Sequence, residues 1–367
     1  MKHLLTAIKH QRCRAILTLL LALMILAVGC TPAQNPYDGY ERHTDSFFDT
    51  FDTLIQVIAY TTSEEEFQQA FEQAHQRFRE LHQLYDIYNT YAGMNNVKTV
   101  NDQAGIAPVA VDEDLISLIL FAREWHDRTA GRTNIAMGPV LKIWHEYRAD
   151  GLFDPSLAEL PPLEDLQRAT AYTDIHLIEV DEAAGTVYLP DSRMRLDIGA
   201  IAKGYATELV AKELEGEGLE SFIISAGGNV RAANRPFDNE RETWTVGLHN
   251  PDASLFAEGN SLLGSVSITN ASVVTSGDYQ RFYIVDGQPV HHLIDPVTLM
   301  PAAHYRAITV VMEDSGMADF FSTELFLLPF EESLPMAESI EGLEAIWVMP
   351  DGRIEKTAGM ETILTLY

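Results

Sequence analysis

The sequence predicts an α+β fold, built as a single domain of mixed strands and helices. Three observations lead to this prediction. The chain has 367 residues, enough for one large or two ordinary domains with a substantial core. From Ile175 onward, short strand-like segments alternate with two helical segments, and hairpin signals recur. That mixture differs from the regular strand–helix–strand winding that builds parallel sheets.

The amino terminus is typical of an export signal. Four basic residues precede an apolar run over residues 15–28, which is too short for a confident membrane span. The run ends in Leu26-Ala27-Val28-Gly29-Cys30, which resembles a bacterial lipoprotein signal except for Ala27, where Leu is usual. We therefore expect residues 1–29 to be removed. Residues 30–46 would form a lipidated Cys30 and a polar tether, and residues 47–367 the folded domain, held by its lipid anchor on the outer face of the cytoplasmic membrane.

Charge and cysteine content exclude several classes of function. The net charge is −29, and it becomes more acidic once the basic signal is removed. Such a surface repels nucleic acid, so we expect no nucleic-acid partner, and any phosphate ligand needs local positive charge. Only Cys30 remains after the signal leaves, which excludes an intramolecular disulfide, a cysteine nucleophile and a cysteine metal site. The glycine patterns of Rossmann, P-loop and serine-hydrolase sites are absent from the sequence.

The first elements of the domain follow from periodicity and capping. Residues 51–60 suit a strand, and Ser63 with Glu66 makes a capping box that opens a helix. That helix places an apolar residue every third or fourth position up to Tyr85. A second helix is expected over residues 114–126, and residues 150–166, rich in Pro, Asp and Glu, read as a surface excursion.

Residues 275–301 combine several features of a ligand site. A strand over residues 281–285, an Asp286-Gly287 turn and a return strand predict a hairpin. His291 and His292 must point to opposite faces of the return strand. Ser276-Gly277 leaves backbone open to close approach by a ligand. An ordinary hairpin with a hydrogen-bonded histidine explains the same pattern.

Two glycine-containing turns are candidate phosphate sites. In residues 195–206 we expect a strand ending at Asp197, a turn at Gly199 and a helix through Leu214, with Lys203 adding positive charge to free helix N–H groups. In residues 225–231 the Gly227-Gly228 pair could let backbone approach a ligand, with Arg231 nearby. Simple packing at a strand–helix junction and at a hairpin are the alternatives.

A possible metal site and a possible ring-stacking residue complete the candidates. Asp319 and Thr323 are four residues apart, hence on one helix face, and their hard oxygen donors suit Mg²⁺. An Asp that favours the helix dipole is the simpler explanation. Trp144, in the segment over residues 133–145, could stack on a planar ring or be buried in the core.

The order and wording of six segments resemble the FAD:protein FMN transferase (ApbE) family over residues 48–367. These segments are GPVLKIW, LDIGAIAKGYA, SAGGNVR, TSGDYQRF, HHLIDP and ADFFST. The resemblance implies an α+β fold with FAD held between two lobes. Members cleave the FAD pyrophosphate, transfer FMN to a Thr or Ser of a flavoprotein and release AMP.

Matching the motifs residue by residue implies roles for positions of this chain. Asp319 and Thr323 would bind Mg²⁺ by their side chains and Ala200 by its carbonyl. His292 would be the base that activates the acceptor hydroxyl, with His291 as the alternative. The remaining residues implied to contact FAD are Trp144, Asp197, Lys203, Gly228, Ser276, Gly277 and Ile294.

The chain departs from the family pattern in places, and other functions remain possible. Phe51-Asp52-Thr53 stands where Met-Gly-Thr is frequent, residues 134–137 lack the usual Asp and Thr, and Leu299 replaces a usual Gly. Alternatives to the transferase are an FAD pyrophosphatase, which uses water as the acceptor, and a lipoprotein that binds FAD without chemistry.

Overall fold

The computed structural model describes residues 37–253 and 261–367. The expected signal, Cys30 and most of the tether lie outside the described residues. The folded unit is Tyr40–Tyr367, which begins a few residues before the expected domain over residues 47–367. The reason is that Glu41–Thr50 forms a strand that pairs antiparallel with Thr53–Thr61, which draws residues 41–46 into the sheet.

The core of the fold is an eight-stranded sheet in which every neighbouring pair is antiparallel. Its strands, in order across the sheet, are β1 (Glu41–Thr50), β2 (Thr53–Thr61), β6 (Ser221–Ala226), β7 (Asn229–Ala233), β10 (Ala271–Gly277), β13 (Ala307–Met312), β14 (Glu344–Val348) and β15 (Ile354–Lys356). Strands far apart in sequence are therefore neighbours, as β2–β6 and β10–β13 show. This antiparallel arrangement confirms the predicted α+β class.

Three smaller sheets accompany the large one. They are β16-β9-β8, β11-β12 and β3-β5-β4. Their strands are β3 (Val109–Ala110), β4 (Glu179–Asp181), β5 (Thr186–Tyr188), β8 (Trp244–His249), β9 (Leu262–Ile268), β11 (Phe282–Val285), β12 (Gln288–His291) and β16 (Leu364–Leu366). The β11–β12 pair is the hairpin that the sequence predicted. Asp286 and Gly287 both have positive φ, as a tight two-residue turn requires.

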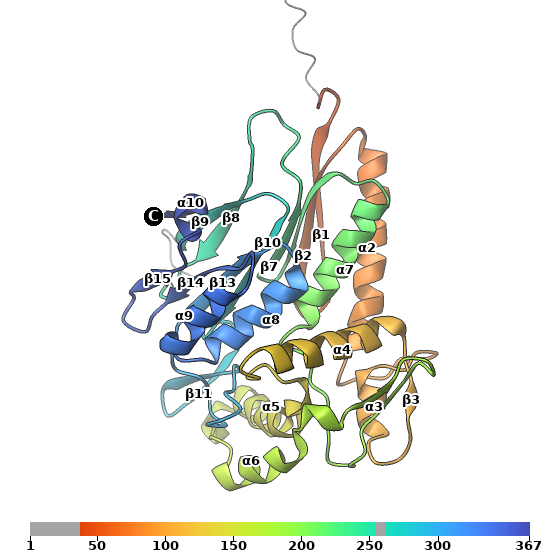
Figure 1. Ribbon diagram of the computed structural model, residues 1–367, viewed down its shortest axis with the longest axis vertical. Helices are drawn as coiled ribbons and strands as arrows, with labels where there is room; N and C mark the ends of the chain where they lie inside the picture. The colour runs from red at the N-terminus through yellow and green to blue at the C-terminus, as the bar shows by residue number, and fades with distance from the viewer. Residues whose placement is uncertain (1–36, 254–260) are drawn as a thin grey trace, which may run out of the picture. The chain divides into compact units, whose positions relative to one another are not determined.

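Helices α2, α7, α8 and α9 pack along the large sheet, and α3 to α6 gather below it in the view of Figure 1. The α-helices are α2 (Glu64–Tyr85), α3 (Val97–Asp102), α4 (Glu113–Arg128), α5 (Gly138–Phe153), α6 (Leu163–Ala169), α7 (Ala202–Gly216), α8 (Ser315–Phe326), α9 (Phe330–Ser339) and α10 (Met360–Ile363). Short 3₁₀ turns are η1 (Ile135–Met137), η2 (Pro155–Leu157), η3 (Thr170–Tyr172) and η4 (Ile175–Leu177). Among the described residues, no helix is both long and apolar enough to cross a bilayer.

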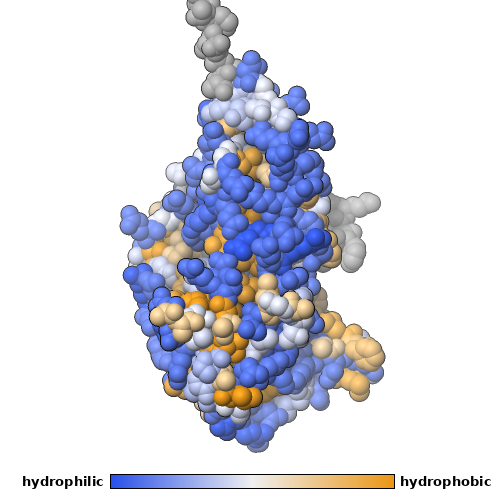
Figure 2. All heavy atoms as spheres, turned by 90° about the vertical axis from the view of Figure 1, so that its right-hand side faces the viewer, coloured by the Kyte–Doolittle hydropathy of each residue, from blue (hydrophilic) through white to orange (hydrophobic). Residues whose placement is uncertain are grey.

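Among the described residues, two buried apolar clusters are relevant to the site. The larger one lies between the sheet and its helices, and it includes Phe78 of α2, Phe222 of β6 and Trp347 of β14. The smaller one joins α5 to the β11–β12 hairpin through residues such as Trp144 and Tyr283. At the surface, hydrophilic residues dominate the face with α2 and β1, and hydrophobic side chains gather lower down (Figure 2).

Two local predictions need correction. Ser63 does cap α2 by accepting a hydrogen bond from Glu66 N, but the Glu66 carboxylate bonds to Thr62 N instead of closing the capping box. The strand expected before Asp197 is not formed. That stretch runs irregularly to Ile201, and Asp197 N donates to the carbonyl of Ile135 at 2.8 Å. A tertiary contact thus takes the hydrogen bond that a sheet neighbour would have supplied.

Candidate active site

A cavity of about 250 Å³ opens where the two apolar clusters meet. Met137 and Ile294 line it from the smaller cluster, and Ile198 and Ala202 from the larger. Most of its polar side chains come from four elements that are distant in sequence. These elements are α5, the segment leading into α7, the β10–β12 region and α8. The cavity is therefore a product of the tertiary fold, with an apolar floor and converging polar groups, which is typical of a ligand site.

Asp319 and Thr323 face this cavity from α8, and both are only 6% exposed. Asp319 Oδ2 accepts a hydrogen bond from Gly204 N at 2.7 Å, in the first turn of α7. A Cβ at Gly204 would lie 2.3 Å from the Cβ of Asp319, so only glycine allows α7 and α8 to approach this closely. The Gly within the AKGYA segment thus positions the carboxylate.

The donor set at this point consists of hard oxygens. Ala200, just before α7, lines the same cavity. Within the described residues, the Thr323 hydroxyl and the Ala200 carbonyl have no hydrogen-bond partner. Oxygens of this kind suit Mg²⁺ rather than a soft metal.

Lys203 and Asp319 influence each other's charge in this pocket. Burial raises the pKa of Asp319, and the Lys203 charge and the Gly204 hydrogen bond only partly offset this. Burial likewise lowers the pKa of Lys203, against the attraction of Asp319. Each group is therefore less well stabilised in its charged form than in water. A cation bound beside Asp319 would favour its ionised form, and an anion bound beside Lys203 would favour its protonated form.

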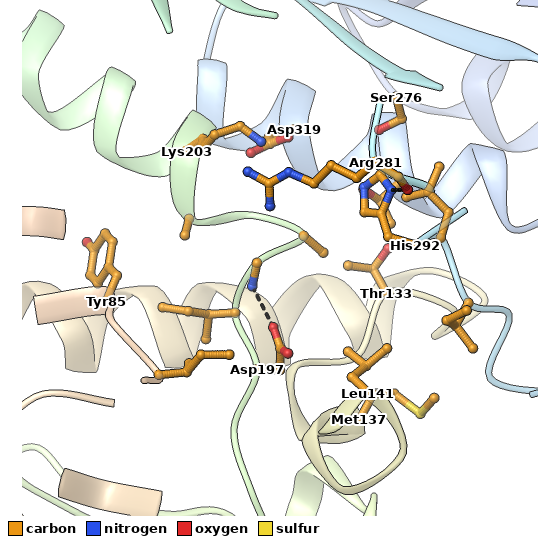
Figure 3. A pocket seen from close by; sticks show the side chains of 18 of the residues that line it. Tyr85, Thr133, Met137, Leu141, Asp197, Lys203, Ser276, Arg281, His292 and Asp319 are labelled. Atoms are coloured by element: carbon orange, nitrogen blue, oxygen red, sulfur yellow. Dashed lines mark hydrogen bonds between the residues drawn. The ribbon is translucent and has the colours of Figure 1, made fainter. Parts of the chain in front are cut away.

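Three cations line the cavity without an ion-pair partner in the part of the chain that the structure describes. They are Arg148 of α5, Lys203 of α7 and Arg281, which immediately precedes β11. In Figure 3 the Arg281 side chain extends from beside His292 toward Lys203 and Asp319. Burial lowers the pKa of Arg148, and the nearby Arg281 acts in the same direction. Asp52, Asp86, Asp197 and Asp319 line the same cavity, but the three cations form no ion pair with them among the described residues, so their charges are available to an anionic ligand.

His292 is held in the cavity wall with its protonation state constrained. Its Nδ1 lies 3.2 Å from the carbonyl oxygen of Arg281, so Nδ1–H donates there and Nε2 is left as the acceptor. Burial, with Arg281 and Lys203 adding repulsion, lowers the pKa of His292 to about 3. The imidazole is therefore neutral near pH 7 and able to accept a proton.

His291 points to the other face, as the alternation along a strand predicted. Its Nε2–H donates to the carbonyl of Ala302 at 2.8 Å, and its Nδ1 accepts from Leu293 N at 3.2 Å. Both ring nitrogens are thus occupied, and His291 is not among the residues lining the cavity. This placement favours His292 over the alternative, His291, as the candidate base.

Asp197 lines the cavity next to His145. Asp197 Oδ1 accepts from Gly199 N at 3.0 Å, and its Oδ2 is 3.7 Å from His145 Nε2. Burial lowers the pKa of His145, although the Asp197 charge opposes this. The carboxylate thus organises the turn before α7 and also faces the cavity.

Comparison with known proteins identifies the family. Residues 51–347 match the model of the ApbE family. The chain belongs to the ApbE family. Two curated relatives, both named FAD:protein FMN transferase, are 32% identical to it. The relative from Treponema pallidum (strain Nichols) aligns over 271 residues, 71% of this chain and 72% of the relative, and that from Klebsiella pneumoniae (strain 342) over 272 residues, 74% and 80%.

Solved ApbE structures share the fold. The ApbE protein of Thermotoga maritima superposes with a TM-score of 0.73 at 24% identity, covering 88% of this chain and 98% of that one. The apo form of flavinyl transferase ApbE from Pseudomonas stutzeri gives 0.72 at 21% identity, covering 88% and 97%. The predicted family and fold class are therefore both confirmed.

Three ApbE-motif residues expected to contact FAD do not line the cavity described above. Trp144 is buried in the smaller cluster, and its indole N–H donates to the Leu299 carbonyl at 3.1 Å. Gly228 forms the β6–β7 turn and lines a neighbouring cavity of about 640 Å³. Gly277 is covered by the ring of Tyr279, 2.5 Å from where its Cβ would be. In contrast, Asp197, Ala200, Lys203, Ser276, His292, Ile294, Asp319 and Thr323 all line the first cavity.

Arg231 is likewise not a phosphate ligand in this structure. It is buried and pairs with Glu208 and Glu215 of α7 at 3.2 and 3.1 Å. Residues 225–231 do form a hairpin, with Gly227 and Gly228 both at positive φ.

Sequence reasoning missed the cavity face of α5. Met137, Leu141, His145 and Arg148 all line the cavity, whereas Trp144 packs into the core. Their spacing of four, four and three residues is the signature of one helix face. The same spacing is present in the sequence, but the prediction centred on Trp144, which lies on another face of the helix.

Two departures from the ApbE pattern fall on backbone that usually requires glycine. Phe51 and Asp52 have φ of 53° and 51° in the β1–β2 turn, and both line the cavity. Leu299, which stands where the family usually has Gly, is buried and has φ of 62°, so the turn places a leucine in the left-handed region.

Proposed function

We propose that this chain is a Mg²⁺-dependent FAD:protein FMN transferase. It would move FMN from FAD to the hydroxyl of a Thr or Ser in a flavoprotein and release AMP. One observation carries the proposal: in a very acidic protein, three unpaired cations converge beside a buried carboxylate–hydroxyl pair in one cavity. The names of the curated relatives support the same reaction class.

The residues present fit a Mg²⁺ ion. Asp319, Thr323 and the Ala200 carbonyl would hold it, because they supply hard oxygens of which two lack other partners among the described residues. The raised pKa of Asp319 shows that Lys203 alone does not balance its charge. Bound there, Mg²⁺ would neutralise charge on the phosphate oxygens of FAD.

The chain's own side chains would bind and align the pyrophosphate. Phosphoryl transfer requires alignment and charge neutralisation more than covalent assistance. Arg281 and Lys203 are placed to contact phosphate oxygens from two sides of the cavity. Their lack of carboxylate partners leaves their donors available to the ligand.

His292 would act as the base for the acceptor hydroxyl. Its Nε2 takes the proton as the hydroxyl oxygen bonds to the phosphorus of the FMN half. The bond from that phosphorus to the bridging oxygen breaks, and AMP leaves with that oxygen. Negative phosphates bound nearby would raise the pKa of His292 from about 3 toward neutrality, which makes it a more effective base.

We place the reaction on the outer face of the cytoplasmic membrane. The support is the lipoprotein-like signal ending at Cys30. The acceptor would be a flavoprotein exposed on the same side, so that enzyme and acceptor meet without crossing the bilayer.

The test is to incubate the purified chain with FAD, Mg²⁺ and a small FMN-acceptor domain and to measure the intact mass of the acceptor. The expected result is a gain of one FMN that EDTA prevents. AMP accumulating beside an unmodified acceptor would instead identify an FAD pyrophosphatase. Tight FAD binding with neither product would identify a binding protein.

A further inference from the structure

Two histidines and an aspartate meet on the surface, away from the cavity. His126 and Asp127 are in the last turn of α4, and His176 is in η4. Each offers one ligand atom, and these three atoms lie within 4.8 Å of one another. None of the three residues lines the active-site cavity. The cluster is therefore separate from the Asp319 site and has different donor chemistry.

The two distances from Asp127 Oδ1 to the histidine nitrogens match neighbouring ligands of a tetrahedral metal site. His126 Nδ1 is 3.3 Å from Asp127 Oδ1, and His176 Nε2 is 3.4 Å from the same oxygen. In a tetrahedron with metal–ligand bonds of about 2.0 to 2.1 Å, neighbouring ligand atoms are about 3.3 to 3.4 Å apart. An ion bound at these atoms would therefore leave both distances to Asp127 Oδ1 nearly unchanged.

The surroundings also favour a cation at this position. The carboxyl end of α4 carries the negative end of the helix dipole. The nearby Arg128 is directed to Glu124, at 3.0 Å, and lies over the ring of Trp125. Its charge is thus engaged elsewhere, while His176 and Asp127 are accessible to solvent and hence to an incoming ion.

The orientation of the His126 ring is set by the backbone that follows α4. Gly131 has φ of 68°, and a Cβ there would lie 2.9 Å from His126 Nε2. The Nε2 edge is therefore covered and Nδ1 is directed to Asp127. A ring held in this way needs little reorganisation to bind a metal ion.

We propose that His126, Asp127 and His176 form a second metal site, for Zn²⁺ or a similar borderline transition metal, with water completing the coordination. Two imidazoles and one carboxylate are ligands that such ions prefer and that Mg²⁺ does not. The bound ion links α4 to η4. Asn134, which lines the active-site cavity, bonds to the carbonyl of Thr173 at 2.9 Å, so the linked segments support the cavity wall.

The test is calorimetric titration of ZnCl₂ into the purified full chain with Mg²⁺ in excess to occupy the hard-oxygen site. Wild-type protein is expected to bind one more Zn²⁺ than the His176→Ala variant, or to bind it at least about tenfold more tightly. His176 is exposed, and among the described residues its side chain makes a single polar contact, to Asp127. Its replacement should therefore leave the fold unaffected. His304→Ala, at another exposed histidine, is the matched control and should bind as wild type.

A thermal-unfolding series provides the second readout. Zn²⁺ should raise the unfolding temperature of wild type and of His304→Ala, but raise it less in His176→Ala. Asp127→Asn should behave like His176→Ala, and it replaces that variant if His176→Ala proves unstable. Equal Zn²⁺ binding by wild type and both cluster variants, or no Zn²⁺ binding by wild type, would overturn the proposal. The outcome is independent of the transferase test, since Mg²⁺ and FAD use other residues.

Discussion

Replacing Asp319 by Asn tests the proposed metal site more cleanly than replacing it by Ala. The carboxylate has a structural role, because Oδ2 accepts from Gly204 N at 2.7 Å and joins α8 to the start of α7. Alanine removes that acceptor together with the charge. Asparagine keeps an oxygen that can accept from Gly204 N but lacks the negative charge that Mg²⁺ requires.

The expected magnitudes separate the two roles. A hydrogen bond to a charged group contributes about 1.5 to 3 kcal/mol, so Asp319→Ala should lower the free energy of unfolding by about 2 kcal/mol. In Asp319→Asn, loss of a carboxylate that burial disfavours is offset by loss of the charge facing Lys203. Its metal-free stability should therefore stay within about 1 kcal/mol of wild type. Transfer should nevertheless fall by about 10² to 10³, the typical effect of losing one preorganised electrostatic contribution to a transition state.

Two measurements check these values. Urea unfolding in EDTA gives the stability, and the initial rate of mass gain of the acceptor across a Mg²⁺ series gives the activity. Asp351→Asn, an exposed carboxylate outside the cavity, is the control and should change neither. A wild-type rate with unchanged Mg²⁺ dependence in Asp319→Asn would refute the metal assignment.

Four further predictions concern Arg281, His292 and Leu299. Arg281→Gln should weaken FAD binding about tenfold or more, because a charge-assisted contact to phosphate is lost. The control Arg353→Gln, at an exposed ion pair, should leave FAD binding unchanged, and flavin fluorescence quenching measures both affinities. His292→Gln should slow transfer at least about 100-fold with little change in FAD affinity, and a parallel loss of affinity would make it only a binding residue. The folded pKa of His292 is depressed to about 3, below its unfolded value of about 6.5. Its contribution to stability is therefore present above pH 6.5 and is lost as the pH falls toward 3. In urea unfolding, His292→Gln should reduce this fall in the free energy of unfolding by up to about 1.4 kcal/mol per pH unit. Leu299→Gly relieves about 1 to 2 kcal/mol of backbone strain but loses a buried side chain that contributes about 3 kcal/mol or more. The variant should therefore be less stable than wild type, and a more stable variant would show that strain dominates.

Local patterns predicted much of the fold. The period of apolar residues gave α2 and α4 to within a few residues, because one face of each helix packs on the core. Asp286-Gly287 marked the β11–β12 hairpin because its turn demands positive φ. The strand before Asp197 was wrong, because a contact with Ile135, 62 positions earlier, replaced the expected sheet neighbour.

Motif order also located most of the candidate site. Asp319 and Thr323 are one turn apart on α8, so their common direction follows from helix geometry alone. Trp144 and Gly277 were misplaced for a different reason. A residue within a family motif can serve packing as well as ligand contact, and Trp144 and Gly277 both pack against neighbouring residues.

What residue order established here is the family, the α+β class and the acidic charge, since each depends on composition, local period or short-range spacing; the proposed metal-ligand pair, Asp319 and Thr323, also comes from short-range spacing. What needed the tertiary structure is the cavity itself. Arg148 and Arg281 lie 133 residues apart in the chain and converge there without ion-pair partners among the described residues, and His292 faces inward while His291 does not contact the cavity. Such convergence depends on how distant elements pack, and burial then sets the protonation of each group that the packing encloses.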